Sequence, residues 1–252
     1  MNKIALITGA TAGIGQAIAC RLAENGYNLI ITGRREARLF DLKGEIETKF
    51  QVKVLALSFD VRRYDEVVAN LEHLSEEWKN IDVLVNNAGL AVGLNPIHTG
   101  VVDDWERMID TNIKGLLYVT RTISPGMVDR KNGHIINIAS IAGKDVYPNG
   151  NVYCATKHAV DALSKAMRID LLPYNIKVTQ ICPGAVETEF SIIRFKGDEA
   201  KANQVYKGFT PLDANNIADA VLYAISQPPH VDVQDMLIMP TAQATGSLFH
   251  KE

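Results

Sequence analysis

The chain is poor in cysteine and has no long apolar run. Its three cysteines, Cys20, Cys154 and Cys182, stand far apart, which excludes a disulfide framework and a CxxC metal pair. No stretch approaches the roughly 20 consecutive apolar residues of a membrane helix. The apolar run Ile4 to Ile7 is too short for the core of a signal peptide. We therefore expect a cytoplasmic protein that does not associate with membranes.

The charge balance also lacks an excess of one sign. Lys and Arg together number 26, Asp and Glu together number 29, and the formal net charge is −3. A nucleic-acid-binding protein usually carries a basic field that neutralises phosphates, so we expect no nucleic-acid partner. The six histidines lack the paired spacing around a glutamate that zinc hydrolases show, and we expect no metal site.

Hydrophobic residues make up 47% of the 252 residues, which is enough for a sizeable core. Segments with helical spacing of apolar residues, such as Ile14, Ile18 and Leu22, alternate with short apolar runs typical of buried strands. This alternation predicts an α/β fold, a single Rossmann-type domain over residues 1–252 with a doubly wound parallel sheet and helices on both faces. The expected strands are Ile4 to Ile7, Leu29 to Thr32, Val52 to Leu57, Ile81 to Val85, His134 to Ile138, Ile176 to Ile181 and Met236 to Met239.

One section, Glu187 to Pro211, lacks a clear period and mixes charged residues with aromatics. Long irregular segments at the carboxyl edge of an α/β sheet often cover a ligand. We interpret the segment as a substrate lid over about residues 187–211. A surface excursion without function is the alternative.

A glycine-rich turn joins the first expected strand to the first expected helix. Gly9, Gly13 and Gly15 follow a GxxxGxG spacing rather than GxGxxG. Glycine lets the backbone approach a pyrophosphate closely, and the free amides at a helix start attract an anion. A tight turn without a ligand would show the same glycines, so the motif alone leaves both readings open. The candidate cofactor contacts of this turn are Gly9, Thr11, Ala12, Gly13, Ile14 and Gly15.

The second expected strand is followed by Arg34 and Arg35. An NAD-selective fold places an acidic residue here to hold the ribose 2′-hydroxyl, and no acid is present. Two guanidinium groups bind a 2′-phosphate well. The sequence therefore favours NADP over NAD as cofactor.

A tyrosine and a lysine share one face of a later helix. Tyr153 and Lys157 are four residues apart, in a segment whose apolar residues continue at helical spacing. A free phenol has a pKa of about 10, so proton transfer near neutral pH requires a lower value, and the lysine charge would supply part of the shift. Ser140 ends the fifth expected strand, at the sheet edge where ligands bind. Each residue alone could be structural, but the combination predicts a site that transfers a proton to or from the oxygen of a carbonyl or alcohol substrate.

With these motifs, the chain resembles the short-chain dehydrogenase/reductase family over nearly its whole length. The matching segments are Thr8 to Gly15, Asp60-Val61, Asn86 to Gly89, Asp110 to Asn112, Tyr153 with Lys157, and Pro183-Gly184 through Thr188. The resemblance implies a catalytic tetrad of Asn112, Ser140, Tyr153 and Lys157. The further cofactor contacts that it implies, besides Arg34 and Arg35, are Asp60, Val61, Asn87, Ala88, Gly89, Tyr153, Lys157, Pro183, Gly184, Val186 and Thr188.

The resemblance also implies the role of each tetrad member. Tyr153 is the general acid in reduction and the base in oxidation, and Ser140 binds and polarises the substrate oxygen. Lys157 lowers the pKa of Tyr153 and holds the nicotinamide ribose. Asn112 positions a water that links the lysine to solvent. We expect Ser140 and Tyr153 to contact the substrate.

A narrower resemblance is to NADP-dependent 3-hydroxy acid dehydrogenases, which include serine and L-allo-threonine dehydrogenases. It is carried by Ala91 to Gly93, Gly150 to Tyr153, Arg194 to Asp198 and Met239 to Gln243. It implies oxidation of the 3-hydroxyl of small 3-hydroxy acids or β-hydroxy amino acids, or reduction of the matching 3-oxo compounds. Alternatives are a carbonyl or 3-oxoacyl reductase of the same family, and a protein that senses NADP without turnover.

Three expectations concern the surroundings of the site. Arg194 and Lys196 are candidates for binding a substrate carboxylate. Glu187 places a carboxylate in the nicotinamide loop, where the narrower resemblance implies a glycine pair. Cys154 and Cys182 are interpreted as small packing residues rather than nucleophiles. The family resemblance further implies a homodimer or homotetramer.

Overall fold

The computed structural model describes residues 2–252, and within them one parallel sheet has seven strands in the order β3-β2-β1-β4-β5-β6-β7. The strands are β1 (Ile4–Thr8), β2 (Asn28–Gly33), β3 (Val54–Ser58), β4 (Val83–Asn86), β5 (Gly133–Ile138), β6 (Ile176–Pro183) and β7 (Asp235–Ile238). The expected Rossmann-type sheet is thereby confirmed. Every neighbouring pair of strands is parallel, so each connection crosses a face of the sheet.

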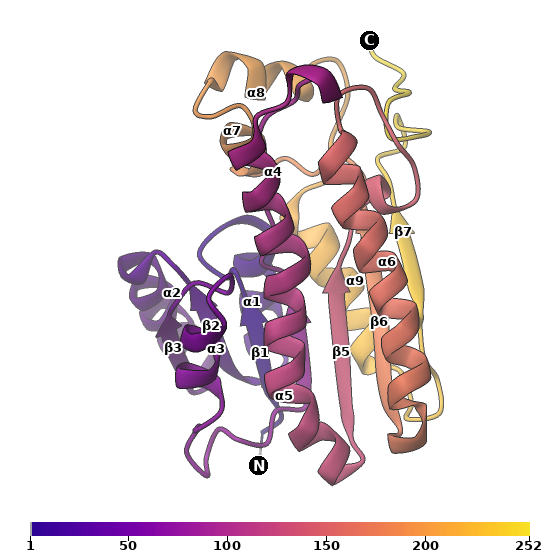
Figure 1. Cartoon of the computed structure of the whole chain (residues 1–252). Coiled ribbons are helices and arrows are strands. Elements are labelled where there is room, and N and C mark those ends of the chain that lie inside the picture. Colours follow the sequence, from indigo (N-terminus) through magenta and orange to yellow (C-terminus); the bar gives the residue numbers. More distant parts are fainter. Residues whose placement is uncertain (1) are drawn as a thin grey trace.

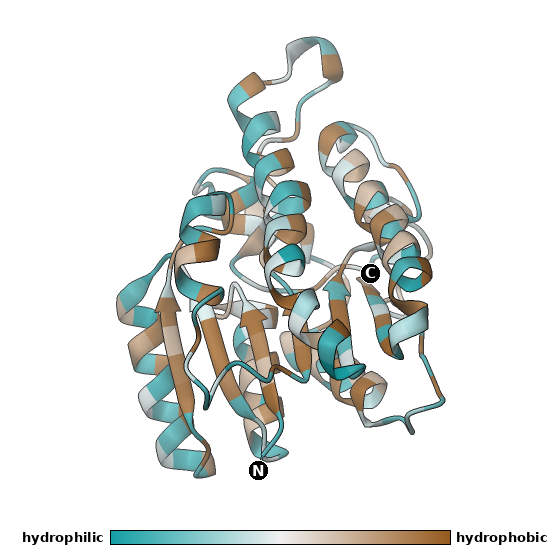
Figure 2. Cartoon of the chain, turned by 60° about the horizontal axis from the view of Figure 1, so that its bottom comes forward, coloured by the Kyte–Doolittle hydropathy of each residue, from teal (hydrophilic) through white to brown (hydrophobic). Residues whose placement is uncertain are grey.

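Helices cover both faces of the sheet (Figure 1). One face is covered by α1 (Gly13–Glu24), α2 (Glu36–Phe50) and α9 (Ala214–Ser226), and the other by α3 (Tyr64–Leu71), α5 (Leu116–Arg130) and α6 (Asn151–Leu171). The remaining helices are α4 (Val102–Ile109), α7 (Phe190–Arg194) and α8 (Glu199–Val205). In Figure 2 the hydrophobic colour lies on the strands, and the outer helix surfaces are mostly hydrophilic. The described residues include no helix long and apolar enough to cross a membrane.

The two hydrophobic cores follow from the alternation of side chains along each strand. On β1, Ala5 and Ile7 pack into the core beneath α1, α2 and α9, whereas Ile4 and Leu6 pack into the core beneath α3, α5 and α6. A strand that is buried on both faces needs apolar residues at every position. This explains why the expected strands appear in the sequence as uninterrupted apolar runs.

The apolar runs Val52 to Leu57 and Ile81 to Val85 begin two residues before the strands β3 and β4. Val52 and Ile81 lie outside the strands but are buried in the two cores. Burial rather than strand pairing therefore selects apolar residues at these positions.

The strand order reverses between β1 and β4, which lie side by side although β2 and β3 separate them in the sequence. At such a switch point the following helices leave to opposite faces of the sheet, and a crevice opens at the carboxyl ends of the strands. The glycine turn follows β1, and the segment Asn87 to Asn95 follows β4. The fold thus brings both segments to one crevice.

A buried histidine makes the stability of this sheet sensitive to acid. His134 on β5 is buried, its Nε2 atom forms a hydrogen bond of 2.8 Å with the Thr179 hydroxyl on β6, and burial lowers the pKa of His134 to about 3. The unfolded chain binds this proton at a pKa of about 6.5. Between these pH values the unfolded state binds more protons than the folded state, so stability falls as pH falls.

Because of His134, we expect the free energy of unfolding to fall by about 1.4 kcal/mol for each pH unit between pH 6 and pH 4. Urea unfolding of wild type and His134→Asn across this range measures the contribution as a difference in slope. The exposed His73 offers the matched control His73→Asn, which should keep the wild-type slope. Identical slopes in wild type and His134→Asn would contradict the prediction.

Candidate active site

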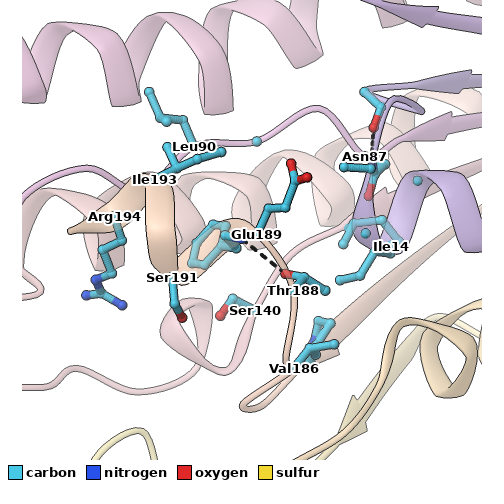
Figure 3. Close-up of a pocket in the computed structure, with 18 of the residues that line it drawn as sticks. Ile14, Asn87, Leu90, Ser140, Val186, Thr188, Glu189, Ser191, Ile193 and Arg194 are labelled. Atoms are coloured by element: carbon cyan, nitrogen blue, oxygen red, sulfur yellow. Dashed lines mark hydrogen bonds between the residues drawn. The ribbon is translucent and has the colours of Figure 1, made fainter. Parts of the chain in front are cut away.

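A cavity of about 660 Å³ lies at the carboxyl ends of the central strands. The expected site residues that line it are Gly9, Thr11, Ala12, Gly13, Ile14, Gly15, Arg34, Arg35, Asp60, Val61, Asn87, Ala88, Gly89, Ser140, Tyr153, Lys157, Pro183, Gly184, Val186 and Thr188. Asn112 is not among the lining residues. In Figure 3, Ile14 and Asn87 lie at one end of the cavity, Arg194 lies at the other, and Thr188 and Glu189 lie between them.

The glycine turn at one end has the geometry of an anion cradle. Gly9 and Gly13 have φ angles of +68° and +54°, a conformation that favours glycine. A Cβ atom on Gly15 would lie 2.4 Å from the Asn87 side-chain nitrogen and from the Gly9 carbonyl oxygen. Helix α1 begins at Gly13, after an alanine whose side chain cannot cap it. Its first amides are thus available to an anion, and the turn fits a pyrophosphate.

Two side chains hold this turn against the end of β4. The Thr8 hydroxyl accepts hydrogen bonds from the amides of Asn87 and Ala88, each 3.0 Å long. The Asn87 side chain donates to the carbonyl oxygens of Thr8 and Gly9. Asn87 therefore lines the cavity and also ties the two strand ends together. Thr8 lies in the segment that matches the family's glycine motif, but its role in joining the two strands could not be predicted, because its partners lie about 80 residues away.

The two arginines after β2 lie in different environments. Arg34 has a 62% exposed side chain, and its Nη1 atom lies 3.9 Å from Asp60. The Arg35 guanidinium donates to the Thr11 hydroxyl through Nε and Nη2, and its Nη1 atom lies 2.8 Å from Glu189. Both arginines line the cavity, and their positive charge at the end of β2 fits a ribose 2′-phosphate.

The reactive end of the cavity combines residues from β5 and α6. Ser140 follows β5, and its hydroxyl accepts a hydrogen bond of 3.1 Å from the Ala142 amide, so it also caps a short helical turn. Tyr153 and Lys157 lie one turn apart on α6 and are both buried. The Lys157 ammonium donates to the Ile138 carbonyl oxygen at 2.9 Å and lies 5.9 Å from the Tyr153 ring centroid. The structure thus brings these three residues together, as expected.

Burial dominates the ionisation of the tyrosine and the lysine. Burial raises the pKa of Tyr153 above its usual range, while the nearby Ser140 hydroxyl and Arg194 charge act in the opposite direction. Burial lowers the pKa of Lys157 to about 8. The protein's own groups therefore keep the phenol protonated at neutral pH, contrary to the expected decrease. The nearby cation of Arg194 opposes this shift. The expected effect of Lys157 on the pKa of Tyr153 stays a prediction.

Asn112 lies in a turn of π-helix, Asp110–Gly115, between α4 and α5. Its side chain accepts from the Leu90 amide at 2.7 Å and donates to the Leu90 carbonyl oxygen and the Thr156 hydroxyl. Such π-helical turns often mark functional sites. The geometry makes Asn112 a positioning residue that joins the segment after β4 to α6, next to Lys157.

The segment 187–211, for which the name lid is kept although its closing over a ligand stays a prediction, includes two short helices, α7 and α8, above the sheet (Figure 1). The preceding loop is tied down where the Glu187 amide donates to the Leu212 carbonyl oxygen at 2.8 Å. Glu187 itself is exposed and does not line the cavity, so its carboxylate lies away from the reactive end.

The structure separates the two cationic candidates on the lid. Arg194 lines the cavity, and its Nη2 atom donates to the Tyr147 hydroxyl at 2.9 Å. Lys196 lies outside the cavity lining, where its ammonium pairs with the buried Asp104 at 2.7 Å. Lys196 is thus the wrong candidate for a contact inside this cavity, because its charge is already paired on another face of the lid.

Several further residues line the cavity without having been named as contacts. Those that belong to the expected lid include Glu189, Phe190, Ile193 and Tyr206. Those outside the lid include Leu90, Tyr147, Gln243 and Phe249. Tyr147 and Gln243 could have been found, since each lies in or beside a segment that the narrower resemblance singled out. Gln243 is buried, and its side chain accepts from the Ala185 amide at 2.8 Å. It therefore fixes the loop that follows β6.

Neither cysteine beside the site has the environment of a nucleophile. Cys154 and Cys182 are buried, and burial raises the pKa of both thiols, that of Cys182 to about 12. Both are packing residues in the protein interior, as expected from the sequence. Residues 2–252 contain no cluster of histidine, cysteine and carboxylate side chains that could hold a metal ion.

Comparison with known proteins places this site in a family. Residues 3–198 match the family model described as short chain dehydrogenase. The chain is 48% identical to an NADP-dependent 3-hydroxy acid dehydrogenase of Salmonella typhi, over 97% of this chain and 98% of the relative. It is 41% identical to sulfoacetaldehyde reductase 2 of Chromohalobacter salexigens, over 97% and 96% of the two chains. The chain therefore belongs to the short-chain dehydrogenase family, as the sequence motifs predicted.

Two solved structures extend this comparison. The closed form of a serine dehydrogenase complexed with NADP+ matches with a TM-score of 0.92 and 45% identity, covering 99% of this chain and all of that one. A serine dehydrogenase from Escherichia coli matches with a TM-score of 0.82 and 41% identity, covering 96% and 99%. The fold of this chain is thus more similar to the closed form than to the second structure.

The cradle geometry predicts that Gly15→Ala weakens dinucleotide binding. The added methyl group would push the Asn87 side chain and the Gly9 carbonyl out of place, so we expect at least a tenfold higher Kd for NADPH, about 1.4 kcal/mol. Fluorescence titration measures the Kd, and circular dichroism confirms the fold. Gly44→Ala on α2, where a Cβ atom meets nothing within 4 Å, is the control and should bind as wild type does. Equal affinities of the two variants would contradict this role of Gly15.

Proposed function

We propose that this chain is an NADP-dependent dehydrogenase that acts on the 3-hydroxyl of small 3-hydroxy acids or β-hydroxy amino acids, and on the matching 3-oxo compounds in reverse. The observation that carries the proposal is one cavity lined by the paired arginines, by Ser140, Tyr153 and Lys157, and by the cation of Arg194. Relatives named for NADP and 3-hydroxy acids, at 46–48% identity over 97% of the chain, support the same activity.

NADP supplies the hydride acceptor for oxidation, and NADPH supplies the hydride donor for reduction. The residues that would hold the dinucleotide are the glycine turn for the pyrophosphate and Arg34 and Arg35 for the 2′-phosphate. Lys157 would bind the nicotinamide ribose. These residues would position the cofactor, and a side chain of the protein would transfer the proton.

Tyr153 is proposed to exchange the proton with the substrate oxygen. Its buried phenol is protonated at neutral pH, which is the form that donates a proton during reduction. Ser140, at the carboxyl end of β5, binds the same oxygen and orients it. Asn112 fixes the segments that carry Leu90 and Thr156, and its part in a water relay stays a prediction.

Arg194 is proposed to bind the substrate carboxylate. Its guanidinium carbon lies 5.6 Å from the Tyr153 ring centroid and 5.2 Å from that of Tyr147. Its Nε atom is buried and, among the described residues, has no hydrogen-bond partner. A buried N–H group that lacks a partner destabilises the site, and an anionic substrate group would satisfy it. The charge thus stands beside the catalytic phenol, within reach of a short 3-hydroxy acid.

A sulfonate has the same charge as a carboxylate, so a small sulfonated aldehyde is the second candidate substrate. The 41% identical sulfoacetaldehyde reductase favours it. An uncharged carbonyl compound or an acyl thioester would offer no anionic group for Arg194 to bind at this place.

We further propose that the chain acts in the cytoplasm as a homodimer or homotetramer. The three free cysteines suit a reducing compartment. The family resemblance supports packing of α5 and α6 against a second copy, and the exposed apolar residues Leu117, Ile169 and Leu172 on and after these helices are compatible with it.

The proposal predicts reduction of NADP+ by small 3-hydroxy acids. Purified protein is mixed with NADP+ or NAD+ and with L-serine, L-allo-threonine, 3-hydroxyisobutyrate or 3-hydroxypropionate, and nicotinamide absorbance is followed. We expect turnover of several substrates with NADP+ and at least tenfold lower kcat/KM with NAD+. Failure with all four substrates would remove the substrate class, and sulfoacetaldehyde, dicarbonyls and acyl thioesters would be tested with NADPH.

Tyr153→Phe is the matched variant for this assay. It removes only the phenol oxygen, so NADPH binding should persist while turnover is lost. Unchanged turnover would overturn the role of Tyr153, whereas binding without turnover in the wild type would indicate a sensor.

Replacement of Arg194 should act on substrate binding. We expect Arg194→Gln to raise KM for 3-hydroxyisobutyrate about 10- to 100-fold, because a charge-assisted hydrogen bond contributes about 1.5–3 kcal/mol. An uncharged ketone substrate should be much less affected. Lys201→Gln removes an exposed charge from the same lid and is the control. Equal changes for the acid and the ketone would show that Arg194 does not recognise the carboxylate.

A further inference from the structure

We infer that Glu189 is a latch that fastens the lid to Arg35 and Arg38 and sets the rate at which NADP(H) leaves the cavity. The inference rests on the proposed function, because it takes NADP(H) as the ligand. It goes beyond that function in assigning cofactor retention to a lid residue that the proposed chemistry does not use.

The two ion pairs join segments that are far apart in the sequence. One carboxylate oxygen of Glu189 lies 2.8 Å from Nη1 of Arg35, and the other lies 2.7 Å from Nη1 of Arg38. Glu189 directly precedes α7 on the lid, whereas the arginines lie at the start of α2, about 150 residues earlier. Each carboxylate oxygen thus holds its own guanidinium, and the lid is fastened to α2 at two points.

Arg35 extends this connection to the glycine turn. Its Nε and Nη2 atoms donate to the Thr11 hydroxyl at 3.1 and 2.9 Å, while its Nη1 atom donates to the Glu189 carboxylate. Thr11, Arg35 and Glu189 all line the cavity. A continuous polar bridge therefore runs along the cavity wall from the phosphate cradle to the lid, and the lid cannot lift here without breaking it.

The far end of α7 has separate attachments. The Gly93 amide donates to the Arg194 carbonyl oxygen at 3.0 Å, and Lys196 pairs with the buried Asp104. Within the lid, the Tyr206 hydroxyl donates to the Val186 carbonyl oxygen before α7 at 2.8 Å and lies 2.6 Å from the Ser191 hydroxyl on α7. The Gly93 and Asp104 contacts hold the Arg194 end of α7, and the Glu189 pairs fasten the end that faces the glycine turn to α2.

The strength of the latch suits repeated opening. The paired side chains are 41%, 42% and 49% exposed, so solvent screens their attraction. The Arg35 and Arg38 guanidinium groups lower the pKa of Glu189, so the carboxylate stays charged at neutral pH. Such exposed ion pairs are weak enough to break and form again as the cofactor enters and leaves.

The alternative is that Glu189 competes with the 2′-phosphate for the arginines. Arg38 argues against it, because it pairs with Glu189 but does not line the cavity and so is no part of a phosphate pocket. Arg34, which lies 3.9 Å from Asp60 and is largely exposed, remains available for the phosphate. Arg35 uses three of its five N–H donors for Thr11 and Glu189, which leaves two for the phosphate. The two alternatives predict opposite effects of removing the Glu189 charge.

The test is the dissociation rate of NADPH from four proteins: wild type, Glu189→Gln, Arg38→Gln and the double variant. Bound NADPH is displaced by excess NADP+ in a stopped-flow instrument, and nicotinamide fluorescence is followed. We expect each single variant to release NADPH about three- to tenfold faster, the range for one or two exposed ion pairs. The double variant should be no faster than the faster single one, because both changes break the same connection.

Salt dependence gives a second readout. Raising ionic strength should accelerate release from wild type and have less effect on Glu189→Gln, since screening weakens the pairs that the variant already lacks. Glu199→Gln removes an exposed lid carboxylate outside the cavity lining and should behave as wild type.

Three outcomes would overturn the latch. Slower release from Glu189→Gln would support competition, unchanged release would make the ion pairs incidental, and multiplied effects in the double variant would show that the two residues act separately. Failure of the wild type to bind NADPH would instead overturn the proposed function, and the inference with it.

Discussion

The site depends on the hydrogen bonds that the Thr8 hydroxyl makes between the ends of β1 and β4. This hydroxyl accepts from the Asn87 and Ala88 amides and lies 3.3 Å from the Val85 carbonyl oxygen, to which it donates. Because the group is buried, water cannot replace these partners, and the loss of any of them would leave a backbone group unsatisfied. The position of the glycine turn, and with it the phosphate cradle, follows from this junction.

Burial governs the chemistry at the other end of the cavity. The same low-polarity surroundings raise the pKa of Tyr153 and lower that of Lys157, because each shift favours the uncharged form. The lysine keeps a partner in the Ile138 carbonyl oxygen, which is a dipole rather than a counter-ion. A proton donor and a weakly basic amine are therefore held in one desolvated layer, where a small change in nearby charge shifts the proton balance strongly.

Local sequence patterns predicted those parts of the fold and site that depend on local geometry. Apolar runs identify strands that are buried on both faces, and the four-residue spacing of Tyr153 and Lys157 places them on one helix face. The partners of Asn112 lie 22 and 44 residues away from it, and those of Glu189 lie about 150 residues away. They could not be predicted, because these contacts depend on tertiary packing. The sequence also did not show that Arg194 lines the cavity whereas Lys196 pairs with Asp104 outside it.

The reason for that difference is the end of α7. Arg194 is the last residue of the helix, and two residues later Lys196 has a φ angle of +55°, so the chain turns and the side chains diverge. One faces Tyr147 inside the cavity, and the other faces Asp104 on α4. Gly197, with a φ angle of +91°, marks a turn in the sequence, but it does not show that the turn begins at Lys196, because lysine rarely adopts a positive φ angle.

The shortness of α7 connects the two ends of the cavity. From Glu189 to Arg194 the chain advances roughly 7.5 Å at 1.5 Å per residue. The residue before the helix meets the arginines of α2, and the last residue of the helix meets the tyrosines of the reactive end. Helix α7 thus makes one contact at the cofactor end of the cavity and another at the reactive end. The ion pairs of Glu189 therefore help to fix the position of α7, and with it the place of Arg194 beside Tyr153. The proposed cofactor retention and the proposed carboxylate recognition thus depend on one short element.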